Sequence, residues 1–309
     1  MSAEGIGADR GSTPPGRVSA PAPIAGTIRG AEGVKLRTWS WPHPSPRGRV
    51  QLVHGFSEHL GRYREVVDAL HDAGWAVFGH DHRGHGESEG RRGVLRSFDH
   101  LLHDLDLVRR RADALAPGPG APVLLGHSLG GLVTLRYLQT APAPPSRAIL
   151  SAPWLGTQLV LPLWQQVVAR SLRRIAPDFV VKRRLDTSLL TRDAERGALY
   201  ANDPLVHRYG SPGVLARVGA AQEEAIAGGL PPGMRLLVIL PLDDRVADPE
   251  RTVGWASRLP AGSVQIERYP RGRHEPFHDI ERSAVLDTVI AWLNEEGPSG
   301  SSAEISDEG

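Results

Sequence analysis

The chain has 309 residues, a length that suits one large α/β domain carrying an insertion. Lys and Arg number 36 against 35 Asp and Glu, so the formal net charge is +1 and, with no basic motif interleaved with aromatic residues, nucleic acid is not an expected partner. The absence of cysteine excludes disulfides and thiol catalysis, and no apolar run approaches the ~18–20 residues that span a bilayer.

Both ends of the chain have the composition of segments that do not fold. Residues 1–26 are rich in Gly, Ala, Ser and Pro, and residues 297–309 form an acidic tail rich in Ser and Gly. Too little apolar surface is available there to offset the entropy of ordering, so both tails are expected to be disordered. The N-terminus also lacks the apolar core of a signal peptide, which favours a cytoplasmic location.

Between the tails, short apolar runs alternate with segments of helical periodicity. In the first half of the chain, buried strands are predicted at 49–53, 75–79 and 148–150, and amphipathic helices at 63–70 and 98–108. Gly74 ends the first helix, and the Pro-Gly-Pro-Gly stretch 117–120 closes the second region. Strands separated by helices indicate a parallel sheet with helices on both faces, in which active sites lie beyond the carboxyl ends of the strands.

A short apolar run leads directly into a G-x-S-x-G motif, and helix-forming residues follow at once. Residues 122–133 read Pro-Val-Leu-Leu-Gly-His-Ser-Leu-Gly-Gly-Leu-Val. A strand, a sharp reversal and a helix in this order would leave Ser128 on a tight turn with its hydroxyl exposed above the sheet, as a nucleophile requires. A Cβ at position 126 or 130 would crowd the incoming strand or the outgoing helix. The N–H of Leu129 would point to where an oxyanion forms.

Residues 86–90, Gly-Glu-Ser-Glu-Gly, match the same motif without its context. Ser88 has no strand leading in and no helix leading out, and its two flanking carboxylates would repel a developing oxyanion. Ser88 is therefore predicted to be a loop residue, and Ser128 the nucleophile.

Strands and helices cease to alternate between residues 154 and 226, where several short helices with Pro breaks fit and no strand does. The sheet domain is thus expected in two parts, 27–153 and 229–296, separated by a helical insertion over 154–228.

Two late strands are each followed by residues that could complete a catalytic serine. In hydrolases with this strand–turn–helix serine, the acid and then the base follow along the chain. Residues 264–269 alternate as a strand, and His274 lies in the loop after it, before the final helix. His278 is the nearby rival, but it stands where that helix should begin. His274 is the predicted base.

The sequence pattern does not identify the catalytic acid as clearly as it identifies the base. A buried strand over 234–240 is followed by both Asp243 and Asp244, which periodicity alone does not separate. Asp248 precedes Pro249 and is predicted to be a helix N-cap instead.

Together these segments resemble the monoacylglycerol lipase and lysophospholipase group of α/β-hydrolases. The resemblance runs from about residue 30 to 295, and the His-Gly and Asp-His-Arg-Gly-His-Gly-x-Ser pieces are more specific than G-x-S-x-G. The matching segments are 54–59 with Arg62 and Tyr63, 81–90, 126–131, 151–153, 202–208, 244–248, 269–270 and 273–275.

The resemblance implies an α/β-hydrolase fold, with a mostly parallel central sheet flanked by helices and a helical cap at the insertion. Carried over residue by residue, it makes Ser128 the nucleophile, Asp244 the acid and His274 the base. The backbone N–H groups of Phe56 and Leu129 become the oxyanion donors.

One departure concerns the loop before the acid. Where relatives usually carry a glycine two or three residues earlier, this chain has Pro241-Leu242-Asp243, which weakens the choice of Asp244 over Asp243. Asp244 is preferred. Glu58 and Arg62 are expected to fix the loop that carries Phe56 rather than to react.

The activity implied is cleavage of carboxylic esters of lipids, foremost of monoacylglycerol to fatty acid and glycerol through an acyl-enzyme, with no metal or organic cofactor. Four histidines near the front of the sheet could suggest a metal cluster, but they follow two different strand ends and match the loop pattern of the group; these are His54, His80, His82 and His85. The alternatives are a lysophospholipase, a short-chain carboxylesterase or a small peptidase with the same triad, and, more remotely, a non-catalytic binding protein.

The insertion carries a strongly apolar face over residues 159–172. The preferred interpretation is that this face packs on the core and roofs the site; the alternative is an acyl-chain tunnel that makes transient contact with a membrane surface. Two basic clusters, at 170–174 and 182–184, could favour anionic lipid, although a solvated face is the preferred interpretation for them. The pattern does not define an oligomeric state.

Overall fold

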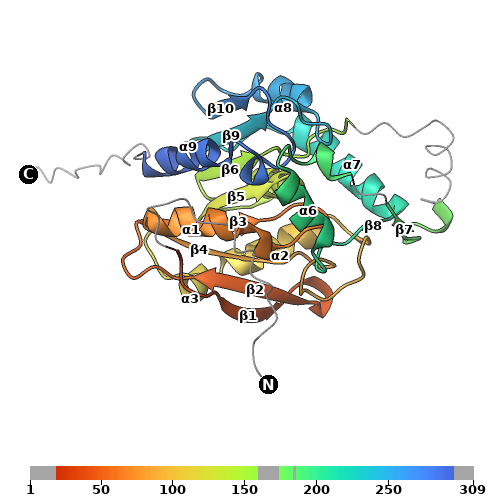
Figure 1. The fold of residues 1–309 in the computed structure, drawn as a ribbon, viewed down its shortest axis with the longest axis horizontal. Coiled ribbons are helices and arrows are strands. Elements are labelled where there is room, and N and C mark those ends of the chain that lie inside the picture. Colours follow the sequence, from red (N-terminus) through yellow and green to blue (C-terminus); the bar gives the residue numbers. More distant parts are fainter. Residues whose placement is uncertain (1–18, 159–173, 184–185, 296–309) are drawn as a thin grey trace, which may run out of the picture.

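A single mostly parallel sheet organises the protein in the computed structural model, which describes residues 19–158, 174–183 and 186–295. Its eight strands follow the order β1-β2-β4-β3-β5-β6-β9-β10, from bottom to top in Figure 1. The strands are β1 (Ile24–Arg29), β2 (Lys35–Trp41), β3 (Gly48–Val53), β4 (Trp75–His80), β5 (Val123–His127), β6 (Arg147–Ser151), β9 (Arg235–Pro241) and β10 (Val264–Tyr269). Within this sheet, the pairs β1–β2 and β2–β4 are antiparallel, and the strands β4, β3, β5, β6, β9 and β10 pair in parallel.

Helices cover both faces of this sheet because the parallel strands are apolar on both sides. On β5, Leu124 packs in one core cluster with α2, α4, α7 and α8, whereas Leu125 packs in the other with α1 and α9. Adjacent residues of a strand point to opposite faces, so one apolar run supplies both clusters. The α-helices are α1 (Arg64–Asp72), α2 (Asp99–Arg109), α3 (Ala112–Leu115), α4 (Leu129–Thr140), α6 (Ala194–Asn202), α7 (Pro212–Ala227), α8 (Pro249–Ala256) and α9 (Arg282–Asn294). Short 3₁₀ turns occur at Ala31–Gly33, Leu60–Tyr63, Thr187–Leu189 and Pro276–His278.

The predicted α/β fold is confirmed, with β3, β4, β6, β9 and β10 within one residue of the expected ranges and β5 leading into Ser128 as expected. Gly74 follows α1 with φ +87°, a conformation that glycine adopts without strain. The prediction that Asp248 caps a helix is also confirmed, because its side chain accepts from the N–H groups of Glu250 and Arg251.

The predicted disordered N-terminal tail, residues 1–26, includes residues that are ordered in the structure. Strand β1 begins at Ile24, and the backbone N–H of Ala20 donates to Asp68 at 2.8 Å. Residues 24–29 pair antiparallel with β2, and neither strand was predicted. Strand β1 lies at the edge of the sheet and is mostly exposed, so it has no apolar run to reveal it. Residues 1–18 and the predicted acidic tail 297–309 lie outside the described residues.

The inserted segment lies at one side of the sheet, to the right in Figure 1. Its helix α7 packs against α4 of the core, where Gln139 donates to the carbonyl of Ala225. The prediction that this segment has no strand was wrong: β7 (Val181–Lys182) and β8 (Tyr209–Gly210) form a two-stranded antiparallel ribbon. The apolar face predicted over 159–172 falls outside the described residues. None of the described helices is both long and apolar enough to cross a membrane.

Candidate active site

Ser128 occupies the turn between β5 and α4. Its backbone has φ +51° and ψ −114°, a conformation in which a non-glycine residue is strained. A Cβ on Gly126 would overlap the carbonyl of Gly130, and one on Gly130 would overlap the carbonyl of Val53 at the end of β3. The second overlap involves β3, a neighbouring strand, and not β5, which leads into the turn. The sequence therefore predicted correctly that a Cβ at these positions would be crowded, but it did not identify β3 as one of the crowding elements. Small residues let the turn fit between two strands and the helix.

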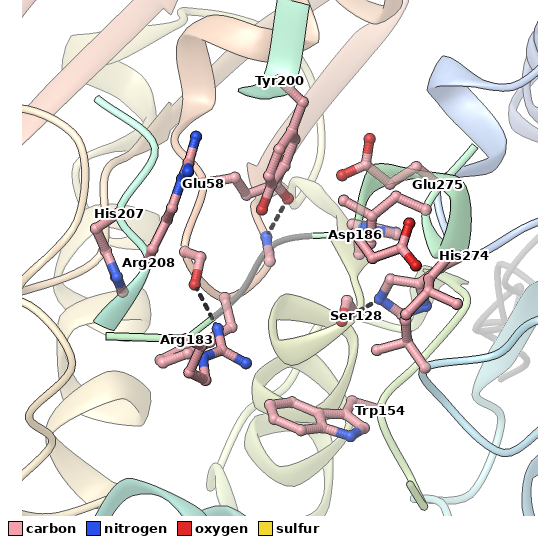
Figure 2. A pocket seen from close by; sticks show the side chains of 17 residues that line it. Glu58, Ser128, Trp154, Arg183, Asp186, Tyr200, His207, Arg208, His274 and Glu275 are labelled. Atoms are coloured by element: carbon pink, nitrogen blue, oxygen red, sulfur yellow. Dashed lines mark hydrogen bonds between the residues drawn. The ribbon is translucent and has the colours of Figure 1, made fainter. Parts of the chain in front are cut away.

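Three predicted side chains form one hydrogen-bonded chain at the carboxyl ends of the strands. His274 Nε2 lies 2.8 Å from Ser128 Oγ, and its Nδ1 lies 2.8 Å from Asp244 Oδ2 (the first contact is drawn in Figure 2). The backbone N–H groups of Val246 and Ala247 donate to the other oxygen of Asp244 and fix the carboxylate. With Nδ1–H donating to Asp244, the Nε2 lone pair is left to accept the serine proton.

The two residues that competed with this assignment point elsewhere. Asp243 turns to the surface, where it forms ion pairs with Arg245 and Arg273 and its side chain is 41% exposed. His278 lies within hydrogen-bond distance of the carbonyl of Arg62. The chain of contacts to Ser128 therefore includes neither of them.

The charge of Asp244 sets the protonation of His274. Burial by itself lowers the pKa of this histidine, but the carboxylate and its hydrogen bond outweigh burial, so that the pKa is raised above the usual value. His274 is therefore a stronger base than an isolated buried imidazole, which matches what removing a serine proton requires.

Ser88, the other serine in a G-x-S-x-G motif, lies in a loop, as predicted. Its hydroxyl donates to the carbonyl of Asp81 at 2.6 Å and accepts from the N–H of Arg37 at 2.8 Å. Both contacts are structural, because the first holds the loop after β4 together and the second ties that loop to β2.

The loop after β3 brings Phe56 beside the serine. Gly55 precedes it, and a Cβ on Gly55 would lie 3.3 Å from that of Ser128. Among the described residues, the backbone N–H of Phe56 and that of Leu129 at the start of α4 donate to no other group. Two free donors beside a serine hydroxyl form the kind of arrangement that stabilises an oxyanion.

A buried cluster of charges braces this loop. Glu58 accepts from the N–H of Gly55 at 2.6 Å and from the hydroxyl of Tyr63 at 2.7 Å. Arg62 pairs with Glu58 and also, through two hydrogen bonds of 2.9 and 2.7 Å, with Glu275. This geometry agrees with the expectation that Glu58 and Arg62 hold the Phe56 loop. The sequence did not predict that Glu275 also pairs with Arg62.

Glu275 directly follows His274, so one guanidinium ties the loop of the base to the loop of Phe56. Although burial by itself raises the pKa of Glu275, Arg62 lowers it to about 2 and keeps the carboxylate ionised. No local pattern reveals this link, because Arg62 and Glu275 are 213 residues apart.

The serine opens into a pocket between the core and the inserted segment (Figure 2). Apolar side chains at its wall include Trp154, Leu189, Leu190 and Val246. Inserted residues add polar groups that sequence reasoning did not place at the site; these are Arg183, Asp186, Tyr200, His207 and Arg208. Arg183 is exposed, as expected for a residue of a solvated face, and its side chain also lines the pocket.

The histidines beside the Phe56 loop are fixed as neutral rings. His54 Nδ1 donates to the carbonyl of Gly55, and its Nε2 accepts from the backbone N–H of His82. His82 in turn donates from Nε2 to the carbonyl of His54. Within the described part of the chain, no group of three or more His, Asp or Glu side chains is arranged to hold a metal ion.

Burial makes these histidines a source of acid sensitivity. It lowers the pKa to about 4 for His80, His207 and His278, and to about 3 for His82 and His127. Between pH ~6.5, where an unfolded histidine titrates, and these lower values, the unfolded chain binds protons that the native protein does not. The stabilisation is complete above that window and is lost as the pH falls through it.

We therefore expect urea unfolding to show a markedly lower midpoint at pH 5.5 than at pH 7.5. Each histidine contributes a slope of up to about 1.4 kcal/mol per pH unit. His80 is fully buried and neither ring nitrogen has a hydrogen-bond partner, so His80→Leu should flatten the slope by up to one proton. Equal midpoints at the two pH values would contradict this prediction.

Comparison with known proteins places this geometry in a family. Residues 44–281 match the family described as Serine aminopeptidase, S33. The chain is 33% identical over 274 residues to the monoacylglycerol lipase of Mycolicibacterium smegmatis, covering 86% of this chain and 95% of that protein. It is 27% identical over 264 residues to phospholipase YtpA of Bacillus subtilis, covering 83% and 99%.

A solved structure agrees with these relatives. The crystal structure of Paleococcus ferrophilus monoacylglycerol lipase superposes with a TM-score of 0.75 at 30% identity, covering 84% of this chain and 98% of that one. The family match spans most of the chain, and the mycobacterial relative is covered almost end to end. The chain therefore belongs to the α/β-hydrolase family described as Serine aminopeptidase, S33, and is a monoacylglycerol lipase-like ester hydrolase within it.

Proposed function

We propose that the protein hydrolyses monoacylglycerol to fatty acid and glycerol with Ser128, His274 and Asp244 as its catalytic residues. The observation that carries the proposal is the unbroken chain of hydrogen bonds from Asp244 through His274 to Ser128 at the wall of a pocket. The relatives named as monoacylglycerol lipases support the choice of ester.

The first half of the reaction forms an acyl-enzyme. Ser128 Oγ attacks the ester carbonyl carbon while its proton passes to His274 Nε2, and Asp244 stabilises the resulting imidazolium. The carbonyl oxygen becomes an oxyanion that accepts hydrogen bonds from the N–H groups of Phe56 and Leu129. Each such donor is worth about 3–4 kcal/mol in the transition state. His274 then gives its proton to the leaving glycerol oxygen as the ester bond breaks.

The second half returns the enzyme to its starting state. A water molecule attacks the acyl carbon and transfers a proton to His274 Nε2, forming a second oxyanion in the same place. When this intermediate collapses, the bond to Ser128 Oγ breaks, His274 returns the proton to that oxygen, and the fatty acid leaves. All proton transfers are made by His274, whose raised pKa suits the role of acceptor.

The pocket wall suits a substrate with one apolar and one polar part. Trp154, Leu189, Leu190 and Val246 offer apolar surface for an acyl chain. Tyr200 lines the same pocket and offers a phenol group to the hydroxyls of a substrate. A lysophospholipid has the same division, and the phospholipase relative makes it the second candidate substrate.

The test is fatty-acid release from a dispersion of mono-oleoylglycerol, with lyso-phosphatidylcholine and a short-chain nitrophenyl ester in parallel and Ser128→Ala as the blank. We expect mono-oleoylglycerol to be cleaved by the native protein and not by the variant. Cleavage of the short ester alone would keep the catalytic residues but move the substrate to small esters. If none of the three is cleaved, the lipase proposal falls and a peptidase or a binding protein takes its place.

A further inference from the structure

Arg183 brings an uncompensated positive charge to the pocket. Its guanidinium donates to Ser57 Oγ at 3.0 Å and lies 5.2 Å from the centre of the Phe56 ring. Within the described residues, no carboxylate forms an ion pair with it. Arg183 is exposed as a residue, yet partial desolvation of its guanidinium at the pocket wall lowers its pKa, and only Tyr200 acts in the opposite direction. Most of the five guanidinium donors are thus left for another acceptor.

His207 adds a second donor without a partner on the same side of the pocket. It is 6% exposed, and its backbone N–H donates to the carbonyl of Ser57 at 2.9 Å. Its Nδ1 accepts from the N–H of Tyr209, which places the ring proton on Nε2, and this atom has no hydrogen-bond partner among the described residues. A buried donor left unpaired costs free energy that a bound acceptor can recover.

The acidic groups of the pocket do not neutralise this side. The carboxylates of Glu58 and Glu275 are occupied by Arg62, and Asp186 accepts from the N–H and hydroxyl of Ser188. In Figure 2, Arg183 and His207 lie to one side of Ser128, whereas Asp186 and Glu275 lie to the other with His274. Two of the pocket carboxylates, Glu58 and Glu275, are therefore neutralised by Arg62, and Asp186 lies across Ser128 from Arg183.

We propose that Arg183, assisted by His207, binds an anionic group on the alcohol part of the ester, so that phosphate- or carboxylate-bearing monoacyl esters are preferred over neutral monoacylglycerols. The proposal rests on the proposed function and specifies its substrate class. An acyl chain is apolar, so the anion of such an amphiphile belongs to its alcohol part. A guanidinium held by one hydrogen bond can offer two parallel N–H groups to a phosphate or carboxylate.

The position of the donors links this group to the reaction. Both Arg183 and His207 contact Ser57, the residue after Phe56, and Ser57 itself has φ +74°. An anion held by these side chains would lie against the loop that supplies one of the proposed oxyanion donors. Substrate binding at Arg183 is thus positioned to favour the productive alignment of the ester carbonyl.

The experiment compares three octanoyl esters at concentrations below micelle formation, so that the charge of an aggregate surface plays no part. Octanoylglycerol is neutral, octanoylglycerol 3-phosphate carries a phosphate, and octanoyl glycerate carries a carboxylate. We expect the native protein to show a higher kcat/KM for at least one anionic ester. Arg183→Gln should lower kcat/KM for the preferred anionic ester by roughly ten- to a hundredfold, the range for a charged hydrogen bond, and for octanoylglycerol by a clearly smaller factor, which reports the lost contact with Ser57.

Lys182→Gln is the matched control, because it removes one positive charge from the adjacent, exposed residue that does not line the pocket. It should leave all three values unchanged. The phosphate and carboxylate arms identify which anion is preferred. The inference is overturned if Arg183→Gln loses kcat/KM equally for neutral and anionic esters, or if the native protein has no preference for an anionic ester. In either case, hydrolysis of octanoylglycerol by the native protein would still support the proposed function. Loss of all ester hydrolysis in the native protein overturns both.

Discussion

Replacing Ser128 with alanine is expected to lower kcat for ester hydrolysis by about 10⁵- to 10⁶-fold, because no other group in the proposed mechanism can form the acyl-enzyme. The change removes the hydroxyl that hydrogen-bonds to His274 Nε2 and leaves the N–H of Leu129 in place. Alanine also fits a turn that already holds a Cβ. The measurement is the burst and steady-state rate with a nitrophenyl ester, together with urea unfolding to show that the fold is retained.

Ser88→Ala provides the matched control in the second G-x-S-x-G motif. It removes one hydrogen bond within the loop and one between the loop and β2, so it should reduce stability by about 1–3 kcal/mol. It should change kcat less than about threefold, because Ser88 contacts neither His274 nor the pocket lining. Retention of native activity in Ser128→Ala, or its loss in a folded Ser88→Ala protein, would show that the nucleophile has been assigned to the wrong serine.

Asp244→Asn is expected to lower kcat by about 10⁴-fold with little change in fold. The amide can donate to Nδ1 and so favours the wrong tautomer of His274, and it no longer stabilises the imidazolium. The pH profile supplies a second measurement. Hydrolysis needs neutral His274, so kcat/KM of the native enzyme should fall as the pH drops through its raised pKa. Without the carboxylate, the largest influence that raises the pKa of His274 is lost while burial remains, so the inflection should move to lower pH.

Asp243→Asn tests the alternative that the sequence left open. This side chain pairs with Arg245 and Arg273 at the surface, so its replacement should change kcat less than about twofold and leave the pH profile in place. The reverse result, a large loss in Asp243→Asn and a small one in Asp244→Asn, would reject the contact between Asp244 and His274 as the functional one.

Local pattern by itself was enough to predict most of the core and two of the three proposed catalytic side chains. A buried parallel strand is read as a short apolar run, and the helix that follows it has apolar residues every 3.6 positions. The strands β3 to β6, β9 and β10 were therefore recognisable without knowing their neighbours in the sheet. The turn at Ser128 was equally visible, because the glycines at 126 and 130 and the adjoining apolar segments are consecutive in sequence. His274 followed from its place after the last strand.

Tertiary structure decided what adjacent or distant residues do. Asp243 and Asp244 are neighbours with equal claims by spacing, and only the direction of the loop after β9 turns Asp244 to His274 and Asp243 to solvent. The exposed edge strand β1 carries no strong apolar signal, because pairing with β2 orders it rather than burial. Its position was therefore missed.

The charged groups around the pocket were the least accessible to sequence reasoning. Arg62 and Glu275 are 213 residues apart, and Arg183 and Ser57 are 126 apart. Periodicity reports which face of an element is apolar, but it does not report which distant side chain will meet a buried charge. A basic run such as 182–184 is therefore ambiguous until the fold places Lys182 in solvent and Arg183 at the pocket. Chain order and spacing were sufficient to predict the role proposed for Ser128, whereas the side chains around its pocket depend on contacts made only after folding.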